Sequence, residues 1–340
     1  MKILAIDTSC DETAAAVTEG TNVLSNVIWS QASAHAKFGG VMPSLAQRMH
    51  EERIDWVINK ALISAKVGIN DIDAIAVTIG PGLSIALGVG IDHAKSLAIK
   101  HSKKLIGVNH LEGHVLSSFA GIVSEDIKYP SLGLVISGGN TILVSINKIH
   151  SYEVLAQTSD DALGEALDKG ARMLGLGYPG GSILEKFARG GRKDKYALPI
   201  PLIGQEKRKM FTYSGLKTAF SRLVESVKPL TKEKINNLAA VFQDKAFTHL
   251  VRVINYIISS SEIKYENLLV GGGVSANVDV RKRLRALGKT YGIKVLFPKS
   301  KKLYGDNAAM IGIAAYYKAK ANKYISPEVV DRKPNAKITD

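Results

Sequence analysis

The sequence predicts an α/β protein made of two related lobes. A strand, a polar turn and a returning strand occur twice, first in Lys2–Thr18 and again in Ser131–Ile146. Around these units, apolar runs of strand length alternate with longer segments whose apolar residues recur at helical spacing. At 340 residues the chain is long enough for two compact cores. The duplication therefore predicts two lobes that face each other across a cleft, each offering a hairpin to the same ligand.

The first lobe is expected to begin with a strand over Lys2–Asp7, followed by the polar turn Thr8–Thr13. Such a turn can present backbone N–H groups and hydroxyls to a phosphate, although an ordinary hairpin turn would have the same composition. Pro43 stands at a position favoured in the first turn of a helix, and an apolar stripe at 3.6-residue spacing follows it. The other predicted elements are strands at Ala14–Thr18, Val23–Trp29, Asp73–Ile79 and Leu105–Val108, and a helix at Ser84–Lys100.

The second lobe is predicted to combine strands with two glycine-rich turns. Three glycines at Gly271–Gly273 let the backbone approach a ligand closely, which suits a nucleoside. Asp306 is expected at the N-cap of the last long helix, where it can cap the helix and also offer an oxygen to a metal. The other predicted elements are a strand at Ser131–Ile136, a turn at Ser137–Asn140, a strand at Thr141–Ile146, helices at Asp161–Leu174 and from Ser182, a surface loop at Gly190–Lys209, and strands at Asn267–Val270 and Val295–Pro298.

His110 and His114 follow the strand that ends at Val108 and open a predicted helix. Residues four apart share one face of a helix, so the two imidazoles can bind a single ion such as Zn²⁺ or Fe²⁺ if a carboxylate from elsewhere completes the site. The zinc-peptidase motif H-E-x-x-H has the same histidine spacing, but here Leu111 occupies the position of its glutamate and Glu112 comes one residue later. A purely structural histidine pair is the alternative.

The composition indicates a chain from a reducing compartment with a polyanionic partner. Its one cysteine, Cys10, excludes an internal disulfide framework, and the chain opens on a strand without a signal or transit peptide. No apolar run approaches membrane-spanning length, so we expect a cytoplasmic protein without a membrane partner. The net charge of +14 favours RNA, although basic clusters can also be solvated surface. These clusters lie at Lys100–Lys104, Arg189–Lys195, Lys207–Lys209, Arg281–Arg285 and Lys299–Lys302.

Nine segments together resemble the TsaD family, the tRNA N6-adenosine threonylcarbamoyltransferases of the actin-like ATPase superfamily. They are DTSCDET (7–13), FGGVMPSLAQRMH (38–50), GPGL (80–83), NHLEGH (109–114), SGGNT (137–141), GEALDKGARMLGLGYPGG (164–181), YSGLKTA (213–219), GGGVSAN (271–277) and GDNAAMIG (305–312). The resemblance implies two actin-like lobes with mixed sheets flanked by helices and a nucleotide cleft between them. The N-terminal lobe would comprise residues 1–108 and about 305–325, with the final helix packing back. Residues 109–304 would form the C-terminal lobe, and 326–340 a tail.

The same resemblance implies transfer of a threonylcarbamoyl group from threonylcarbamoyl-AMP to N6 of the tRNA adenosine 3′ of the anticodon. His110, His114 and Asp306 match the family's metal ligands, with Fe²⁺ the expected ion and Zn²⁺ the alternative, and a phosphate oxygen or water as fourth ligand. The same cleft would also accept ATP or ADP. No Ser-His-Asp or Cys-His nucleophile set is evident, so direct attack is expected, and no general base is assigned. The adenylate-binding positions fall on Val135, Ile136, Ser137, Gly138, Gly139, Asp168, Gly181, Glu185 and Asn277.

The resemblance is to the bacterial branch, because Val135 occupies a position where the archaeal branch has a tyrosine ligand. It implies tRNA, a paralogous TsaB-like subunit and a TsaE-like ATPase as partners, and a TsaC-like synthase that supplies threonylcarbamoyl-AMP. The subunit is expected to dock on the helices at about 43–67 and 84–100. Two other functions remain open at this point. A metallopeptidase would use the same histidine pair, and a non-enzymatic ATP-binding scaffold would use the same lobes.

Overall fold

A computed structural model of the chain describes residues 1–122 and 127–340. The chain divides into two compact units. Unit 1 comprises Met1–Lys128, Lys148–Tyr152 and Phe297–Asp340, and unit 2 comprises Tyr129–Asn147 and Glu153–Leu296. Both units contain a mixed β-sheet flanked by helices, as the sequence predicted. In the described part of the chain, no helix combines the length and apolar character needed to cross a bilayer.

The sheet of unit 1 has the strand order β3-β2-β1-β4-β5. Its first three strands are antiparallel, whereas β4 and β5 run parallel to β1. The five strands are β1 (Lys2–Asp7), β2 (Glu12–Glu19), β3 (Asn22–Ser30), β4 (Ala74–Gly80) and β5 (Lys104–Asn109). The predicted strands all form, and β2 begins two residues earlier than the sequence suggested.

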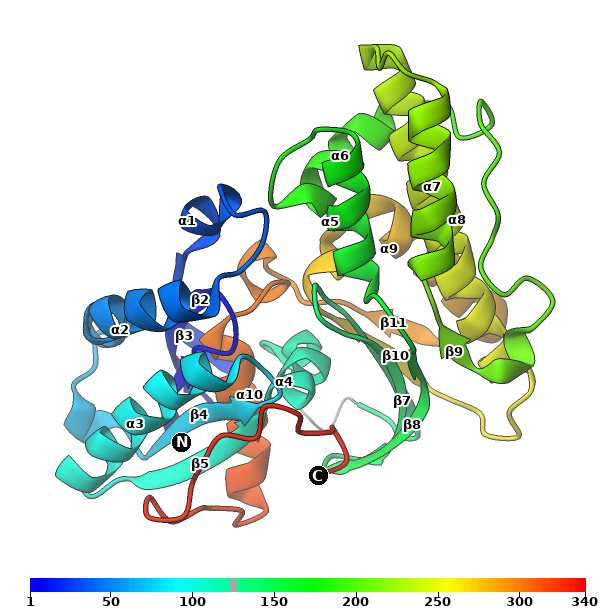
Figure 1. Cartoon of the computed structure of the whole chain (residues 1–340). Helices are drawn as coiled ribbons and strands as arrows, with labels where there is room; N and C mark the ends of the chain where they lie inside the picture. The colour runs from blue at the N-terminus through cyan, green and yellow to red at the C-terminus, as the bar shows by residue number, and fades with distance from the viewer. Residues whose placement is uncertain (123–126) are drawn as a thin grey trace. The chain divides into compact units, whose positions relative to one another are not determined.

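Helices cover both faces of this sheet (Figure 1). The main helices are α2 (Pro43–Ala65), α3 (Ser84–Lys100) and α10 (Ala308–Lys320), with the shorter α1 (Ala32–Ala36) and α4 (His110–Leu116). Apolar residues of α2 and α3 form one core with alternate residues of the strands, among them Leu4 and Ile6. The helix α10 packs on β1, β2 and β5, and the intervening strand residues such as Ala5 are small. Small side chains on that face allow α10 to approach the sheet closely.

The sheet of unit 2 has the strand order β11-β10-β6-β7-β8-β9. Strands β6, β10 and β11 are parallel, and β7 returns antiparallel to β6. The strands are β6 (Ser131–Ile136), β7 (Thr141–Lys148), β8 (Ser151–Thr158), β9 (Met210–Phe211), β10 (Asn267–Gly271) and β11 (Lys294–Leu296). The turn between β7 and β8 lies in residues 148–152, which belong to unit 1.

Five main helices belong to unit 2, and α5, α6, α7 and α8 pack against one another (Figure 1). They are α5 (Leu163–Met173), α6 (Gly180–Arg189), α7 (Ser214–Ser226), α8 (Lys232–Ser259) and α9 (Val278–Tyr291). The helices α7, α8 and α9 and the strands β8 and β9 were not predicted from the sequence. Gly190–Lys209 is mostly irregular, as expected, with one short 3₁₀ turn at Glu206–Arg208.

The C-terminal residues pack along unit 1 instead of leaving its surface. The Ile325 N–H donates to the Leu105 carbonyl at the edge of β5, and the Lys333 N–H donates to the Ile79 carbonyl at 2.6 Å. Val330 is part of the core of unit 1, and its carbonyl accepts a hydrogen bond from the Lys95 ammonium on α3 at 3.3 Å. The Lys337 carbonyl accepts a hydrogen bond from Asn109 Nδ2 at 2.8 Å, so this segment reaches the start of α4.

Candidate functional site

The helix α4 carries the two histidines, and its start is fixed by Asn109 at the end of β5. The Asn109 Oδ1 accepts hydrogen bonds from the N–H groups of Leu111 at 2.9 Å and Glu112 at 3.3 Å, which is a typical N-cap. The helix therefore begins at His110, and His110 and His114 are one turn apart on the same face. Their ring centroids lie 4.6 Å apart.

Asp306 faces both histidines. Its Oδ1 lies 3.2 Å from His114 Nε2 and 3.6 Å from His110 Nε2. One ligand atom from each of the three residues lies within 4.8 Å of the others, which is the spacing of a metal-binding group. The expected N-cap role of Asp306 is wrong, because the Asn307 side chain caps α10 by accepting from the Met310 N–H at 3.1 Å. The one-residue difference leaves the Asp306 carboxylate directed at the imidazoles.

The electrostatics of these three residues suit a cation. The ring of His114 is fully buried, and neither of its nitrogens makes a well-formed hydrogen bond within the described residues. Burial and the charge of His110 lower the pKa of His114, so its imidazole is neutral and able to ligate. Burial would lower the pKa of His110 too, but the Asp306 carboxylate outweighs it and raises that pKa to about 9. Conversely, although burial opposes ionisation of Asp306, His110 holds the pKa of that carboxyl below its usual value. Once His110 gives up its proton to a competing cation, two imidazoles and one carboxylate form a donor set that Fe²⁺ or Zn²⁺ accepts.

Glu112 lies between the two histidines in sequence but takes no part in this group. Its Oε1 accepts hydrogen bonds from His150 Nδ1 at 2.7 Å and from the Tyr152 hydroxyl at 2.9 Å. The Lys318 ammonium lies 3.6 Å from its Oε2. These partners commit the carboxylate to a buried network in unit 1. Glu112 is therefore not placed as the general base that a metallopeptidase requires.

In unit 2, two glycine-containing turns lie at the carboxyl ends of the neighbouring parallel strands β6 and β10. The first turn closes with a hydrogen bond of 2.8 Å from the Ser137 N–H to the Asn140 carbonyl. In the second, Gly272 has a φ of 90°, and a Cβ there would lie 2.4 Å from the Ile136 carbonyl oxygen. Only glycine lets the turns approach so closely. Of the predicted adenylate residues, Val135 and Ile136 are buried β6 positions that can offer only backbone to a ligand.

The other predicted adenylate residues fix the starts of two helices. Asp168 Oδ1 accepts from the Gly181 N–H at 2.7 Å, in the first turn of α6. Asn277 caps α9 with its Oδ1 and donates from Nδ2 to Gln243 Oε1 at 2.9 Å. The Glu185 Oε1 accepts from the Val278 N–H at 3.0 Å, which brings α6 and α9 together. Asp168, Gly181, Glu185 and Asn277 thus belong to one region beside the second turn.

Sequence reasoning missed several polar residues around these positions. Ser9 and Asp7 contact His110, His50 contacts Thr13 and the Cys10 carbonyl next to Ser9, and Gln243 contacts Asn277. The partners of Ser9, His50 and Gln243 are 34 or more positions away in the sequence, so no local pattern indicates these contacts. Asp7 and Ser9 lie in DTSCDET (7–13) and His50 lies in FGGVMPSLAQRMH (38–50), two of the segments that carry the family resemblance.

Several basic side chains of unit 2 form ion pairs with acidic side chains. Asp244 binds the side chains of Lys193 and Arg283, and Glu206 binds Arg252. Arg192 pairs with Asp194 at the surface. The cluster at Arg281–Arg285 is therefore partly a set of structural ion pairs, whose acidic partners are already counted in the net charge of +14.

Comparisons with known proteins agree on one family. The family model described as "TsaD: tRNA N6-adenosine threonylcarbamoyltransferase" matches residues 22–313. The tRNA N6-adenosine threonylcarbamoyltransferase of Clostridium beijerinckii is 44% identical, and the match covers 99% of this chain and 98% of that protein. The enzyme of the same name from Thermodesulfovibrio yellowstonii is 43% identical with the same coverage.

Solved structures agree on the fold. Component A of the Acidaminococcus fermentans (R)-2-hydroxyglutaryl-CoA dehydratase superposes with a TM-score of 0.56 at 16% identity, covering 94% of this chain and 99% of that one. Full-length HypF superposes with a TM-score of 0.57 at 14% identity, covering 95% of this chain and 56% of that one. At this identity the likeness concerns the actin-like ATPase fold alone, and it confirms the fold class predicted from the sequence.

Proposed function

Because the chain belongs to the tRNA N6-adenosine threonylcarbamoyltransferase family, we propose that it uses threonylcarbamoyl-AMP as donor and modifies tRNAs that read codons beginning with A. The acceptor is N6 of the adenosine 3′ of the anticodon. The N6 amine attacks the carbamoyl carbon, the new C–N bond forms, the C–O bond to phosphate breaks, and AMP leaves. One proton is lost from N6, and no residue is assigned to accept it.

The observation that carries this proposal is the convergence of His110, His114 and Asp306 in unit 1. Their donor set favours Fe²⁺, with Zn²⁺ as the alternative. A divalent ion bound there would act as a Lewis acid that stabilises the negative charge of the departing AMP phosphate. The neutral imidazole of His114 offers a nitrogen lone pair, and Asp306 offers a carboxylate that is ionised at neutral pH.

The adenylate would bind in unit 2, at the two turns that follow β6 and β10. Backbone groups of Ser137, Gly138 and Gly139 would hold the phosphate and the acyl group, and Gly181 would offer its backbone beside them. Asp168 and Asn277 fix the backbone on either side, which supplies the positioning that an acyl transfer needs. Glu185 would add a contact to the nucleoside. ATP or ADP, which share the adenosine group, would occupy the same turns.

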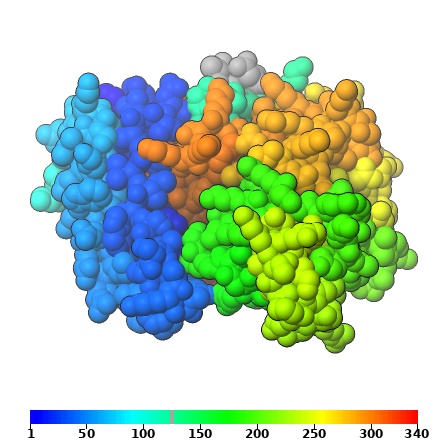
Figure 2. Space-filling model, turned by 90° about the horizontal axis from the view of Figure 1, so that it is seen from above, coloured from blue at the N-terminus to red at the C-terminus, as the bar shows by residue number. Residues whose placement is uncertain are grey.

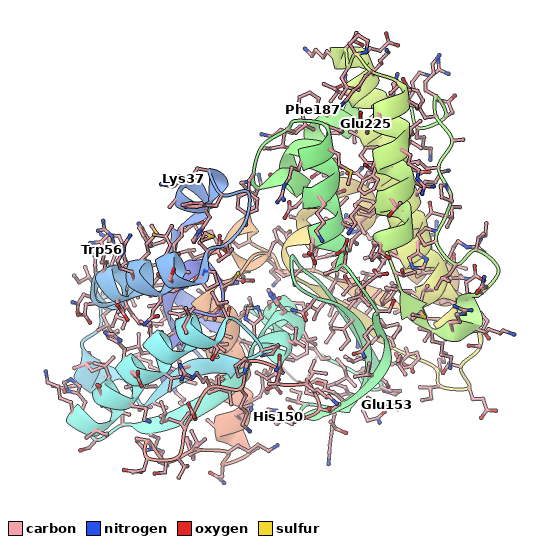
Figure 3. The ribbon with its side chains drawn as sticks, in the orientation of Figure 1. Lys37, Trp56, His150, Glu153, Phe187 and Glu225 are labelled. Carbon is pink, nitrogen blue, oxygen red and sulfur yellow. The ribbon has the colours of Figure 1, made fainter. Side chains whose placement is uncertain are left out.

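The partners would be tRNA, a paralogous TsaB-like subunit, a TsaE-like ATPase and a TsaC-like synthase that supplies the donor. The subunit would dock on the helices α2 and α3 of unit 1, which expose large apolar side chains. Trp56 and Ile63 on α2 are 52% and 69% exposed, and Ile99 on α3 is 63% exposed. A subunit docked on α2 and α3 would cover these apolar side chains and so remove them from water. Trp56 is labelled in Figure 3, where its side chain projects away from α2. Residues of α1 and α2, in blue, are exposed on the face that Figure 2 shows.

The decisive experiment mixes the purified chain, threonylcarbamoyl-AMP and unmodified tRNA, with and without the two protein partners. Modified adenosine is followed by mass spectrometry and AMP by chromatography. Equal amounts of modified adenosine and AMP, formed repeatedly only with the partners, are expected. Repeated turnover by the chain alone would overturn partner dependence and leave the chemistry intact. Release of peptide from a casein substrate, or no product with all partners present, would overturn the transferase proposal.

A second experiment tests the adenylate site by titrating a non-hydrolysable analogue of threonylcarbamoyl-AMP. The double variant Asp168→Ala, Asn277→Ala should bind the analogue at least about 10-fold more weakly, since each lost polar contact costs roughly 1 kcal/mol or more. Asp194→Ala is the matched control, because it removes a carboxylate of the same unit from a surface ion pair. Unchanged affinity in the double variant would exclude this part of unit 2 as the binding site.

A further inference from the structure

The turn between β1 and β2 lies directly against a residue of the metal-binding group. Ser9 Oγ is 3.2 Å from His110 Nδ1, and both side chains are buried. The Ser9 N–H donates to Asp7 Oδ1 at 3.2 Å, and the other oxygen of Asp7 lies 3.8 Å from His110 Nδ1. Nδ1 of His110 therefore faces oxygen acceptors in this turn, while Nε2 faces Asp306. With its hydrogen on Nδ1, the ring would offer the Nε2 lone pair to an ion that displaces the proton between Nε2 and Asp306.

The same turn is held on its β2 side by His50 on α2. His50 Nε2 lies 3.0 Å from the Cys10 carbonyl, and His50 Nδ1 lies 2.8 Å from Thr13 Oγ1. A carbonyl oxygen can only accept, so Nε2 carries the hydrogen and Nδ1 accepts from the Thr13 hydroxyl. Burial lowers the pKa of His50, which keeps the ring neutral in this tautomer. His50, which is 37 positions from Thr13 in the sequence, thus holds the turn through two hydrogen bonds.

A third set of contacts comes from the start of α3. The Leu83 N–H donates to the Ser9 carbonyl at 2.8 Å, and the Thr8 hydroxyl donates to the Ala86 carbonyl at 2.8 Å. A Cβ at Gly82 would lie 2.6 Å from the Ser9 carbonyl oxygen, so the backbones approach as closely as glycine permits. The turn is fixed on the α2 side and on the α3 side, which leaves Ser9 one position relative to His110.

We propose that the β1–β2 turn orients a ligand of the metal centre. Ser9 hydrogen-bonds to His110 Nδ1 and so fixes the orientation of that imidazole. His50 is a positioning residue that holds the turn in place. The inference rests on the proposed function only for the presence of the ion. Residues that hydrogen-bond to the second nitrogen of a ligating histidine fix its tautomer and ring orientation. Their loss typically costs about 10- to 100-fold in metal affinity.

The experiment loads the full-length protein with Co²⁺ and measures its visible absorption spectrum and its affinity by competition with a chelator. Ser9→Ala and His50→Leu should each weaken Co²⁺ binding by about 10- to 100-fold and change the absorption bands. His50→Gln keeps a donor for the Cys10 carbonyl and should recover part of the affinity. Ser25→Ala is the matched control, because it removes a buried hydroxyl that accepts from the Val17 N–H in the same sheet. It should bind Co²⁺ as the wild type does.

Wild-type affinity and spectrum in folded Ser9→Ala and His50→Leu proteins would overturn the inference while the metal centre stands. Failure of the wild type itself to bind Co²⁺, Fe²⁺ or Zn²⁺ would overturn the metal centre of the proposed function and this inference with it. If His50→Leu does not fold, Ser9→Ala and Thr13→Val decide, since each removes only one hydroxyl from the turn.

Discussion

Replacing Glu112 by leucine should destabilise unit 1 severely. Glu112 is 3% exposed, its carboxylate accepts hydrogen bonds from His150 and Tyr152, and it forms an ion pair with Lys318 (His150 is labelled in Figure 3). Leucine has a similar volume, so the change removes the charge and the acceptor without opening a large cavity. Removing one partner of a buried ion pair costs about 3–5 kcal/mol, because the remaining donors are left unpaired. We expect the free energy of unfolding of unit 1 to fall by that amount.

Tryptophan fluorescence gives a direct assay. The only two tryptophans of the chain are Trp29 and Trp56, and both belong to unit 1. Their signal during urea unfolding therefore follows unit 1, with the change in stability taken from the shift of the midpoint. Glu51→Leu is the matched control, since Glu51 is an exposed carboxylate on α2 and should change stability by no more than about 0.5 kcal/mol.

The pH dependence gives an independent check of the same reasoning. Burial would raise the pKa of Glu112, but the His150 hydrogen bond and Lys318 outweigh it and lower the pKa below its usual value of 4.5. A carboxyl group with a lowered pKa stabilises the fold above pH 4.5 and loses that contribution as the pH falls through its value in the folded protein. The difference between wild type and Glu112→Leu should therefore shrink in acid. A loss below about 1 kcal/mol at pH 7 would refute the argument that this network is held together by the charge of Glu112.

Three further predictions follow from other parts of the chain. The double variant His110→Ala, His114→Ala should contain no bound Fe or Zn by elemental analysis after expression with the metal, and full occupancy would exclude these ligands. His249, whose Nε2 accepts from the Thr212 N–H at 3.1 Å, has its pKa lowered by burial to about 4. A buried neutral histidine destabilises the fold as the pH drops from its usual 6.5 toward 4. His249→Gln should therefore reduce the stability lost by unit 2 between pH 7 and pH 4.5 by about 2–3 kcal/mol, measured by circular dichroism in urea, and an unchanged loss would contradict this. Finally, Val330→Ala should cost unit 1 about 2 kcal/mol in the tryptophan assay, because Val330 is 2% exposed within its core; a neutral effect would mean that the C-terminal segment packs loosely.

The elements that were predicted correctly are those marked by a pattern among neighbouring residues. The helix at Ser84–Lys100 and the strand at Ser131–Ile136 have the bounds that their apolar patterns predicted. Pro43 is at the first turn of α2, where proline costs no hydrogen bond. In contrast, α8 has buried residues on several sides because it packs against α5, α6, α7 and α9. A helix buried in this way has no single apolar stripe, which is the pattern that identifies a helix in sequence.

The metal centre marks the limit of local reasoning more clearly. The spacing of His110 and His114 indicated a shared face, and α4 provides it. The local context of Asp306 predicted an N-cap that could also offer an oxygen to a metal, and the family resemblance matched it to a metal ligand. Asp and Asn are equally good N-caps, so adjacent Asp306 and Asn307 cannot be told apart by propensity. Only the tertiary structure decides that Asn307 caps α10 and that the Asp306 carboxylate turns toward the histidines.

The buried polar groups around this centre argue that it is kept for function. The nitrogens of His114 and the Oδ2 of Asp7 are buried without well-formed hydrogen bonds among the described residues. Each such group costs about 1–3 kcal/mol when it is left unsatisfied, and apolar residues of the same size would avoid that cost. Natural sequences accept local violations of this kind mainly at functional sites. A cation that coordinates His114 Nε2 would supply the missing partner for that nitrogen and would be attracted by Asp306, with Asp7 close to His110. The same atoms that cost stability when they are left without partners are therefore the atoms that would bind a metal.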